Sequence, residues 1–435
     1  NSSYQGLARF VVDGMVVLPR GANYIRLNRT SIGSEGFTPS EVPLPAYHST
    51  FSGGKYNRTH AAETLDMISR LGFNLVRVFI DDGRTFCGAA STRTNSDMLE
   101  LVPVLPCTEA TARSNGVGGA WNATTLLPEY MDNFADFLRL ATARGVYVMP
   151  TFQRLPCTAR FLKMTQPPNP NISDGNADYL HLPTIVAKAT YLAEFAAALQ
   201  ARVGSLVTTV LAYSIENEAR AWGDQLPFSD TSLSAVRFAD GKLYDMSSPQ
   251  LRRDGLDACF ALWASRVAAA IRHVDPDALV TAGMFTNYAV GRTTHDPPGS
   301  VKGDPRFPPD PSHLSRHSTL SYLDIHIYPT GAGFSLDADV ASENFGDIDQ
   351  TRVPVLMGEF GAFRSKYPTP DNASEELKSV MLHSCLTYGF QGWLAWTWDT
   401  WEQNWMLWDL VDNHHALALA LAPHNWSHPC FQGSS

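Results

Sequence analysis

Two apolar runs stand out along the chain, because each ends abruptly in acidic residues. Residues 210–220 begin with Val-Leu-Ala-Tyr-Ser-Ile and continue into a Glu-Asn-Glu sequence that contains Glu218. Residues 353–361 begin with Val-Pro-Val-Leu-Met and carry Glu359 near their end. Continuous apolar runs of this length are typical of strands buried on both faces. A carboxylate there is costly to bury unless it is paired or hydrogen-bonded, so both ends are candidate functional positions.

The rest of the chain alternates between strand-like runs and stretches with helical periodicity. The pattern predicts strands at residues 17–25, 73–80, 146–152, 210–220, 278–284, 322–328, 353–360 and 392–398. It predicts helices at 59–71, 128–144, 184–202, 251–273, 336–348, 374–388 and 410–421. Such alternation indicates a parallel sheet, and eight units favour a closed barrel over an open doubly wound sheet. The predicted fold class is therefore α/β, a single (β/α)8 TIM barrel with long loops after its strands.

Two segments interrupt this alternation without dividing the chain into domains. Residues 8–18 predict a short hairpin that turns at an Asp-Gly pair. Residues 81–126 are rich in Ser, Thr, Gly and Asn and predict a long irregular insertion, and loops of that length usually serve a function. No break in composition and no linker occurs, so we expect residues 1–435 to form one domain.

The composition is sufficient for a large core and disfavours several classes of partner. Hydrophobic residues make up 44% of the 435 residues and charged residues 17%, as in folded proteins. The net charge is −10 and no basic block occurs, so we expect no nucleic-acid partner. No apolar run reaches the roughly 18 residues of a membrane span, so we expect no span. We also expect a monomer.

Seven Asn-X-Ser/Thr sequences predict a secreted glycoprotein, extracellular or in a vesicular lumen. The acceptor asparagines are Asn1, Asn28, Asn57, Asn122, Asn171, Asn372 and Asn425. Six cysteines agree with an oxidising compartment. Four of them lie in loop-like sequence, as disulfide partners would, namely Cys87, Cys107, Cys157 and Cys430. Cys259 and Cys385 fall in helical patterns and are equally well explained as buried free thiols, and the connectivity stays open.

Polar and aromatic residues collect at the carboxyl ends of the predicted strands. They are Arg77, Gln153, Asn217, Glu218, His326, Tyr328, Glu359, Trp396 and Trp398. In a barrel these ends converge on one mouth. Hydrolysis of a glycosidic bond needs an acid of raised pKa, an ionised carboxylate across the bond and donors to the ring hydroxyls. Tryptophan adds a flat apolar platform for a sugar ring, so the set predicts a carbohydrate-cleaving site without a cofactor.

Four motifs at the later strand ends resemble glycoside hydrolase family 5, a clan A family of retaining β-glycosidases. They are Asn217-Glu218, His326-Ile-Tyr328, Gly358-Glu359-Phe-Gly361 and Gly392-Trp-Leu-Ala-Trp396. The opening Phe-Val-Val-Asp-Gly and the Gly21-Ala-Asn-Tyr24 sequence, together with the His-X-Tyr pair, are most similar to the endo-β-1,4-mannanase branch. The resemblance implies a retaining β-glycoside hydrolase with β-mannan as its first candidate substrate. A β-glucanase and an exo-acting or glycolipid-cleaving β-glycosidase stay as alternatives.

The same resemblance implies roles for individual residues. Glu218 would be the acid/base and Glu359 the nucleophile, and we expect a raised pKa for Glu218 and a low pKa for Glu359. Asn217 would bind the sugar 2-hydroxyl. Arg77 and Tyr328 would keep Glu359 ionised and oriented.

His326 would complete this network and Trp396 would form the floor of the sugar subsite, with Gln153 and Trp398 in supporting positions. Two positions depart from the family pattern. Ala219 stands where a proline is usual, which affects loop geometry little. Gln153 stands where many members have a histidine or asparagine, and this leaves the substrate class open.

Each assignment has a simpler structural alternative. Period-two alternation places Glu216 on the same face as Glu218, and only the Asn-Glu order of the family favours Glu218. A structural ion pair would account for Arg77 and Glu359, and burial in the core for His326. Packing under a long loop would account for Trp398, Trp401, Trp405 and Trp408.

Other chemistries lack their signatures. His313 and His317 stand four residues apart and His414 adjoins His415, but neither set has a third ligand at metal spacing, so we expect no metal site. No Gly-X-Ser-X-Gly sequence occurs, which disfavours an esterase. A non-catalytic carbohydrate-binding barrel would keep the aromatic residues and lose a carboxylate, whereas both glutamates are present.

Overall fold

The strands of the computed structural model form one closed ring. Parallel strands follow one another in the order β10-β6-β5-β4-β3-β15-β14-β13-β11. Their bounds are β3 (Arg20–Tyr24), β4 (Leu75–Phe79), β5 (Tyr147–Thr151), β6 (Tyr213–Ser214), β10 (Val280–Thr281), β11 (Gly283–Phe285), β13 (Leu323–His326), β14 (Val355–Phe360) and β15 (Trp393–Ala395). The first and last strands of that order, β10 and β11, are separated only by Ala282, so the sheet closes through the two halves of one strand. The predicted (β/α)8 barrel is confirmed.

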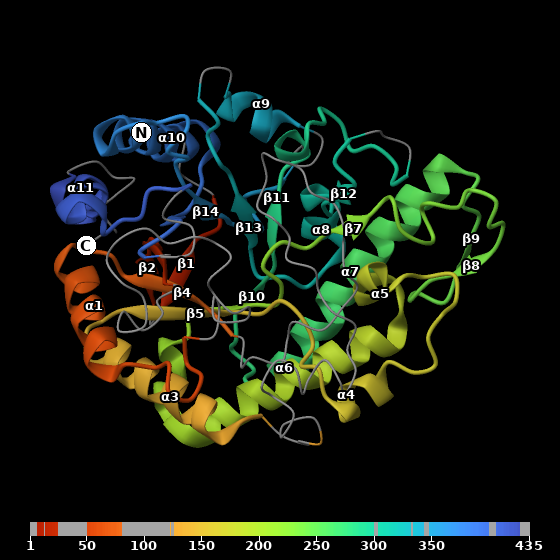
Figure 1. Cartoon of the computed structure of the whole chain (residues 1–435), viewed down its shortest axis with the longest axis horizontal. Helices are drawn as coiled ribbons and strands as arrows, with labels where there is room; N and C mark the ends of the chain where they lie inside the picture. The colour runs from red at the N-terminus through yellow and green to blue at the C-terminus, as the bar shows by residue number, and fades with distance from the viewer. Residues whose placement is uncertain are drawn as a thin grey trace.

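Helices surround the ring of strands (Figure 1). They are α1 (Arg58–Arg70), α3 (Pro128–Thr142), α4 (Ala159–Met164), α5 (Asp174–Leu180), α6 (Leu182–Val203), α7 (Pro249–Val274), α8 (Pro311–His317), α9 (Leu336–Ala341), α10 (Pro370–Tyr388) and α11 (Asp412–Leu421), with the 3-10 turns η5 (Gly204–Thr209), η6 (Tyr288–Val290) and η7 (Pro423–Asn425). The structure describes residues 7–12, 14–24, 50–80, 122, 126–299, 303–331, 334–342, 348–399 and 406–426. Successive outer helices pack on one another, α1 on α3, α3 on α6 and α6 on α7.

Capping side chains set the ends of the long helices. Ser248 precedes α7 and accepts a hydrogen bond from the backbone N–H of Leu251. Thr369 caps α10 in the same way by accepting from Asn372, and a proline follows each cap at the first helical position. Helix α10 ends at Gly389, whose φ of 69° favours glycine. The predicted start of this helix at residue 374 was four residues late because the Thr-Pro cap was overlooked.

The strand predicted in residues 210–220 is much shorter than its apolar run. Only β6 (Tyr213–Ser214) is a regular strand, and before it Val210 makes an isolated parallel bridge to Val148. Beyond β6 the backbone stays attached to β11, since the N–H of Gly283 donates to the carbonyl of Glu216 at 2.9 Å. The acidic end of the run is therefore held beside the fifth strand of the barrel.

The predicted amino-terminal hairpin is present and closes one end of the barrel. Strands β1 (Phe10–Val12) and β2 (Met15–Val17) pair antiparallel. The ring of Phe10 meets that of Tyr322 edge-on at 4.9 Å, within a cluster of side chains from the amino ends of the barrel strands. The predicted insertion at residues 81–126 lies almost entirely outside the described residues.

Two small antiparallel pairs, which the pattern did not predict, form in the loops after the fourth and fifth barrel strands. Strand β7 (Ala221–Trp222) pairs with β12 (Arg306–Phe307), and β8 (Val236–Arg237) pairs with β9 (Leu243–Tyr244). The first pair begins three residues after Glu218, so it extends the wall beside that residue.

One segment differs from the expectation of no membrane-length apolar run. The continuous helical segment of α6 and η5, Leu182–Thr209, is long and apolar enough to cross a membrane by length and composition. Half of its apolar window is buried, and α6 packs on α3, α5 and α7. A helix in the outer layer of a barrel passes the same test, so this feature is explained by its packing.

The described cysteines divide into two kinds. Cys259 is a buried free thiol. Cys157 and Cys385 are each disulfide-bonded, so the free-thiol alternative is wrong for Cys385. The other predicted disulfide partners lie outside the described residues.

Candidate active site

The carboxyl ends of the barrel strands bring most of the predicted site residues into one cluster. It consists of Arg77 (β4), Asn217 and Glu218 (after β6), His326 and Tyr328 (the end of β13 and just beyond), and Glu359 (β14). Hydrogen bonds and ion pairs link these side chains into a single network. None of these six side chains comes from the helices of the outer layer.

Glu359 is held by donors on both of its carboxylate oxygens. Arg77 donates to Oε1 at 2.5 Å, and the Tyr328 hydroxyl donates to Oε2 at 2.7 Å. Nδ1 of His326 lies 3.4 Å from Oε2. Only 5% of the Glu359 side chain is exposed. One donor comes from across the barrel on β4 and the other from just beyond β13, so the two oxygens are held from different sides and have a fixed orientation.

Arg77 connects Glu359 to two asparagines and is itself completely buried. Its Nη1 also donates to Oδ1 of Asn23 at 2.8 Å, and its Nη2 donates to Oδ1 of Asn217 at 2.6 Å. The Asn23 amide in turn donates to backbone carbonyls of Gly358 and Ala395. The guanidinium fork thus fixes Glu359 and Asn217 relative to each other.

A β-bulge at Gly358 aims Glu359 into the cluster. Along β13 and β14, Ile325 pairs with Met357, but the next residue, His326, pairs with Glu359. Gly358 is therefore the extra residue on β14, and an extra residue turns the following side chain to the other face of the sheet. The bulge places Glu359 beside His326.

Glu218 is more accessible than Glu359 and has fewer partners. Its Oε1 lies 3.1 Å from Nδ1 of His326, and its Oε2 lies 3.8 Å from a guanidinium nitrogen of Arg220. Of its side chain, 22% is exposed. The segment that carries it lies so close to β11 that a Cβ on Gly283 would be 1.9 Å from the Asn217 carbonyl oxygen. Glycine at position 283 is needed for this approach.

The two carboxylates lie across a short gap. One oxygen of Glu218, one oxygen of Glu359 and one ring nitrogen of His326 are all within 4.8 Å of one another. Retaining glycosidases have carboxyl groups about 5–5.5 Å apart, whereas inverting enzymes leave about 6.5–9.5 Å for a water molecule. The separation fits direct attack by one carboxylate on a sugar held between them.

The pKa values of the two carboxyls are ordered opposite to the expectation from the sequence. Burial raises the pKa of Glu218, but the hydrogen bond and charge of His326, with the charge of Arg220, outweigh this and hold it at about 2. Burial raises the pKa of Glu359, and His326 and Arg77 offset this only in part. Burial lowers the pKa of His326, but the two glutamates raise it above its usual value. The expected order is wrong for the ligand-free site because one imidazole serves both carboxylates.

Glu216, the competitor of Glu218, points to a different partner. Its Oε2 accepts a hydrogen bond at 3.2 Å from the ammonium group of Lys188 on α6. Lys188 also donates to the backbone carbonyl of Gln153. Glu216 and Gln153 therefore meet at Lys188, and the structure records no bond from either to Glu218 or Glu359. Burial raises the pKa of Glu216, and Lys188 offsets this in part.

The two predicted tryptophans lie in different layers. Trp396 follows β15 and packs edge-on against Phe79 at 5.8 Å, in a small cluster that Tyr328 also joins. Trp398 packs against Phe73 at 6.3 Å within the main core between strands and helices. Trp396 is thus beside the catalytic network, whereas Trp398 has a packing position. Trp401 and Trp405 lie outside the described residues.

Sequence reasoning missed two buried polar residues of this region. Asn23, in the Gly-Ala-Asn-Tyr sequence of β3, accepts from Arg77 and bridges β3 to β14 and β15. Asp324 lies two residues before His326 on β13 and is fully buried. The signal for both was a polar residue inside an otherwise apolar strand, which is the signal that identified Arg77.

Two groups of described residues have atoms spaced closely enough to hold a metal ion. The first is Glu218, His326 and Glu359, whose spacing is already explained by the hydrogen-bond network. The second comprises Asp257 on α7, His295 and Asp310, with Nε2 of His295 between 3.1 and 3.2 Å from both oxygens of Asp257. The sequence missed this second group because its members come from separate elements, and an ion pair between Asp257 and His295 accounts for its geometry.

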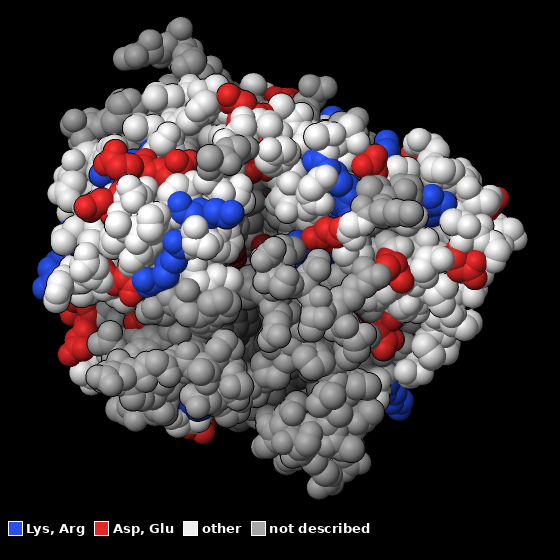
Figure 2. Space-filling model, turned by 45° about the horizontal axis from the view of Figure 1, so that its top comes forward, with Lys and Arg blue, Asp and Glu red and all other residues white. Residues whose placement is uncertain are grey.

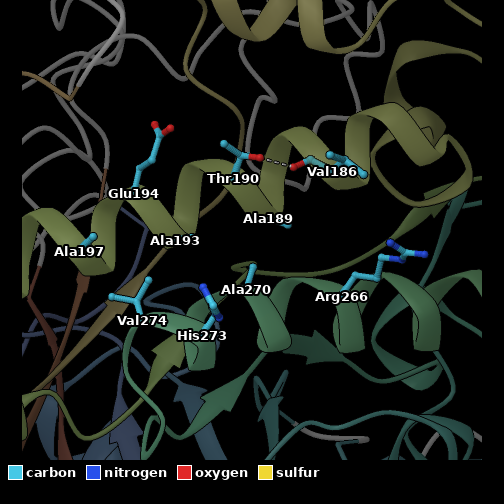
Figure 3. Close-up of a pocket in the computed structure, with 10 residues that line it drawn as sticks. All are labelled: Val186, Ala189, Thr190, Ala193, Glu194, Ala197, Arg266, Ala270, His273 and Val274. Carbon is cyan, nitrogen blue, oxygen red and sulfur yellow. Dashed lines mark hydrogen bonds between the residues drawn. The ribbon is translucent and has the colours of Figure 1, made fainter.

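A groove outside the barrel is unrelated to the catalytic network. It runs between α6 and α7 and is lined by Val186, Ala189, Thr190, Ala193, Glu194, Ala197, Arg266, Ala270, His273 and Val274. Figure 3 shows these mostly small side chains on the facing surfaces of the two helices. On the face shown in Figure 2, acidic and basic side chains are interspersed rather than gathered by sign.

Several solved structures share this fold. The endo-1,4-β-mannanase from Rhizomucor miehei matches with a TM-score of 0.53 at 13% identity, over 96% of this chain and 97% of that chain. The β-mannanase from the blue mussel Mytilus edulis matches with a TM-score of 0.50 at 14% identity, over 97% and 96%. The exo-β-1,4-mannosidase from Opitutaceae bacterium strain TAV5 has a TM-score of 0.48 at 17% identity, and 96% of this chain spans only 57% of that one. At these identities the likeness shows the fold alone.

The sequence itself identifies the family. A model described as cellulase (glycosyl hydrolase family 5) matches residues 38–402. A comparison with curated proteins gives no match. The matched region contains β4 to β15 and the hydrogen-bonded residues Arg77, Asn217, Glu218, His326, Tyr328 and Glu359. The resemblance found in the strand-end motifs is confirmed, and the chain belongs to glycosyl hydrolase family 5, as a glycoside hydrolase of a family characterised by the retaining mechanism.

Proposed function

We propose that the protein cleaves β-mannan by double displacement, with Glu359 as nucleophile and Glu218 as acid/base. The observation that carries the proposal is the gap of at most 4.8 Å between oxygens of the two carboxylates. Glu359 suits the nucleophile because Arg77 and Tyr328 orient both of its oxygens. Glu218 suits the acid/base because it is more exposed and less constrained.

The proposed reaction has two steps. In the first, an oxygen of Glu359 attacks the anomeric carbon while the glycosidic C–O bond breaks and Glu218 gives its proton to the leaving oxygen. In the second, Glu218 takes a proton from water, whose oxygen attacks the anomeric carbon and displaces Glu359. Each step inverts that carbon, so the product retains the configuration of the substrate.

The acid role requires the pKa of Glu218 to rise when substrate binds. A sugar that covers its exposed edge excludes water, and loss of water raises the pKa of a carboxyl group. The Nδ1–H of His326 can also turn fully to Glu359, which removes the hydrogen bond that lowers the pKa of Glu218. Once Glu359 is joined to the sugar, its negative charge is lost and the pKa of Glu218 falls again, as a base requires.

The choice of β-mannan rests on the motif resemblance, in particular the Gly21-Ala-Asn-Tyr24 sequence and the His-X-Tyr pair. Trp396 beside Tyr328 provides an apolar surface next to the network, as a sugar subsite needs. The alternatives are a β-glucan and, with one end of the groove closed, an exo-acting or glycolipid-cleaving activity. A non-catalytic carbohydrate-binding role is disfavoured because both carboxylates are present and paired.

Two measurements test these assignments. Values of kcat/KM for mannopentaose and cellopentaose, which differ at the sugar 2-hydroxyl, should favour the manno compound, and preference for the gluco compound would select the alternative. Trapping with a 2-deoxy-2-fluoro-mannosyl fluoride and peptide mass spectrometry should place the label on Glu359. A label on Glu216 or Glu218 would overturn the assignment of the nucleophile.

We further propose a secreted, monomeric glycoprotein. Four acceptor asparagines, Asn57, Asn122, Asn372 and Asn425, are exposed, and Asn171 is half-buried. The Oδ1 atom of Asn57 caps α1, which leaves its amide nitrogen available for a glycan. Enzymatic removal of N-glycans from protein secreted by eukaryotic cells should lower its mass, and light scattering should give one chain per particle.

A further inference from the structure

Asp324 is a buried carboxyl whose position the network described so far does not use. It lies on β13 and has no exposed surface. Neither carboxyl oxygen makes a hydrogen bond of good geometry with a described residue, although the backbone N–H of Gly358 is close enough to lower the pKa of the carboxyl. Buried polar groups that are incompletely paired are few and need an explanation. Strand residues two apart face the same side, so Asp324 and His326 both face the barrel interior.

The imidazole of His326 also has a buried polar atom that makes no hydrogen bond. Its Nε2 is buried and has no hydrogen-bond partner among the residues that the structure covers. Oδ1 of Asp324 lies 3.9 Å from this nitrogen, within ion-pair distance. Two glycines leave room for these side chains. A Cβ on Gly283 would lie 2.8 Å from Nε2 of His326, and a Cβ on Gly358 would lie 1.7 Å from Oδ1 of Asp324.

The other ring nitrogen must carry a proton for the network to hold. Nδ1 of His326 lies 3.1 Å from an oxygen of Glu218 and 3.4 Å from an oxygen of Glu359. A lone pair on Nδ1 would face two carboxylates and be repelled by both. A negative charge on the far side of the ring favours the doubly protonated imidazole, in which both ring nitrogens carry a proton.

We propose that Asp324 is a positioning residue whose carboxylate forms an ion pair with the protonated imidazole of His326 and thereby keeps an N–H on Nδ1 between the two glutamates. This inference rests on the proposed roles of Glu218 and Glu359. It gives the bulge at Gly358 a second purpose, because the missing side chain there makes space for the Asp324 carboxyl. Asp324 therefore supports the imidazole from below while the substrate side stays open.

The surrounding charges are consistent with an ion pair. Burial raises the pKa of Asp324, with His326, Arg77 and the Gly358 N–H offsetting it in part. The charge of Asp324 in turn helps to raise the pKa of His326. Tyr322, which immediately precedes β13, does not compete for the carboxylate, since its hydroxyl donates to the sulfur of Met149 at 3.0 Å.

The test compares three variants on an aryl β-glycoside that the wild type cleaves. Asp324→Asn keeps the shape and removes the negative charge. Asp324→Leu also removes the polar atoms. Tyr322→Phe is the matched control, because it removes a buried hydroxyl two residues before Asp324, immediately ahead of β13.

Loss of a neighbouring negative charge lowers pKa values, so both limbs of the kcat/KM profile of Asp324→Asn should move to lower pH by about one unit. Its kcat should fall about tenfold at the wild-type optimum with KM little changed, and Asp324→Leu should lose more. Tyr322→Phe should lower the melting temperature and leave both limbs in place.

Unchanged limbs in Asp324→Asn, or equal shifts in Tyr322→Phe, would overturn the proposal. If Asp324→Leu does not fold, the isosteric Asn variant decides alone. Failure of the proposed function is separate, because it would appear as activity retained by Glu359→Gln, whatever Asp324→Asn does.

Discussion

The two ends of this barrel differ in kind although the same strands build both. At the amino ends the interior is apolar, with Leu75 and Leu356 among the side chains that pack beneath Phe10. Two residues further along β4 the interior position is Arg77, and three residues further along β14, beyond the bulge, it is Glu359. The change from apolar core to polar network takes one layer of side chains. If the polar network carries the proposed chemistry, substitutions at the two ends should separate stability from activity.

The largest effect should follow from Glu359→Gln at the catalytic end. Loss of the nucleophile should reduce kcat about 10⁴-fold on an oligosaccharide substrate. The protein should stay folded with a lowered melting temperature, because the buried guanidinium of Arg77 loses the charge of its ion-pair partner. Glu216→Gln removes the same charge from a neighbouring position outside the network and should keep activity within a few-fold. Equal losses in both variants would remove the distinction between the two glutamates.

Arg77→Met should damage both properties, because Arg77 is buried at the border between the two ends. It removes the donors to Glu359, Asn23 and Asn217 and leaves a buried carboxylate without its ion pair. We expect unfolding free energy to fall by about 3–5 kcal/mol and kcat to fall at least about 100-fold. Urea unfolding and steady-state kinetics measure the two losses. Full activity in the folded fraction would contradict the role of Arg77 in orienting Glu359.

Leu356→Ala at the amino end should affect stability alone. The side chain is fully buried below the catalytic layer. Its truncation should lower the free energy of unfolding by about 2–5 kcal/mol, the cost of a cavity in a packed core. Activity per folded molecule at low temperature should equal that of the wild type. A change in the pH–rate profile would show that the two ends are coupled.

A smaller expected effect is on the pH dependence of the melting temperature. The pKa of Glu218 is held at about 2 in the folded protein, below its unfolded value of 4.5, so its contribution to stability is present above pH 4.5 and is lost as pH falls towards 2. Glu218→Gln lacks this contribution. The difference in melting temperature between pH 7 and pH 3 should be smaller in this variant than in the wild type. An equal or larger difference would mean that His326 does not stabilise the ionised carboxylate.

The sequence pattern predicted what depends on local burial. Apolar runs identified the barrel strands, and polar residues towards the carboxyl ends of these runs identified Arg77, His326 and Glu359. The hairpin and most helices were recognised for the same reason, since periodicity and caps are local signals. The two-residue length of β6 could not be predicted, because an apolar run looks the same whether its residues pair continuously or through an isolated bridge such as Val210 with Val148.

Features that depend on distant contacts could not be predicted. The bulge at Gly358 leaves no trace in the apolar pattern, yet it decides which way Glu359 points. Period-two alternation assigns Glu216 and Glu218 to the same face of the strand. The contact that separates their roles is the bond from Lys188, which lies on another element, to Glu216. The order of the carboxyl pKa values depends on the distance from His326 to each glutamate, and no spacing along the chain contains that information.

The central claim is that Glu218 and Glu359 act together on one anomeric carbon across a gap too short for an intervening water molecule. Proton NMR of the product released by the wild-type enzyme in the first minutes of hydrolysis, before mutarotation, tests it most directly. The account predicts a β-anomer from a β-linked oligosaccharide. An α-anomer as first product would mean inversion and would contradict the proposed roles of both glutamates.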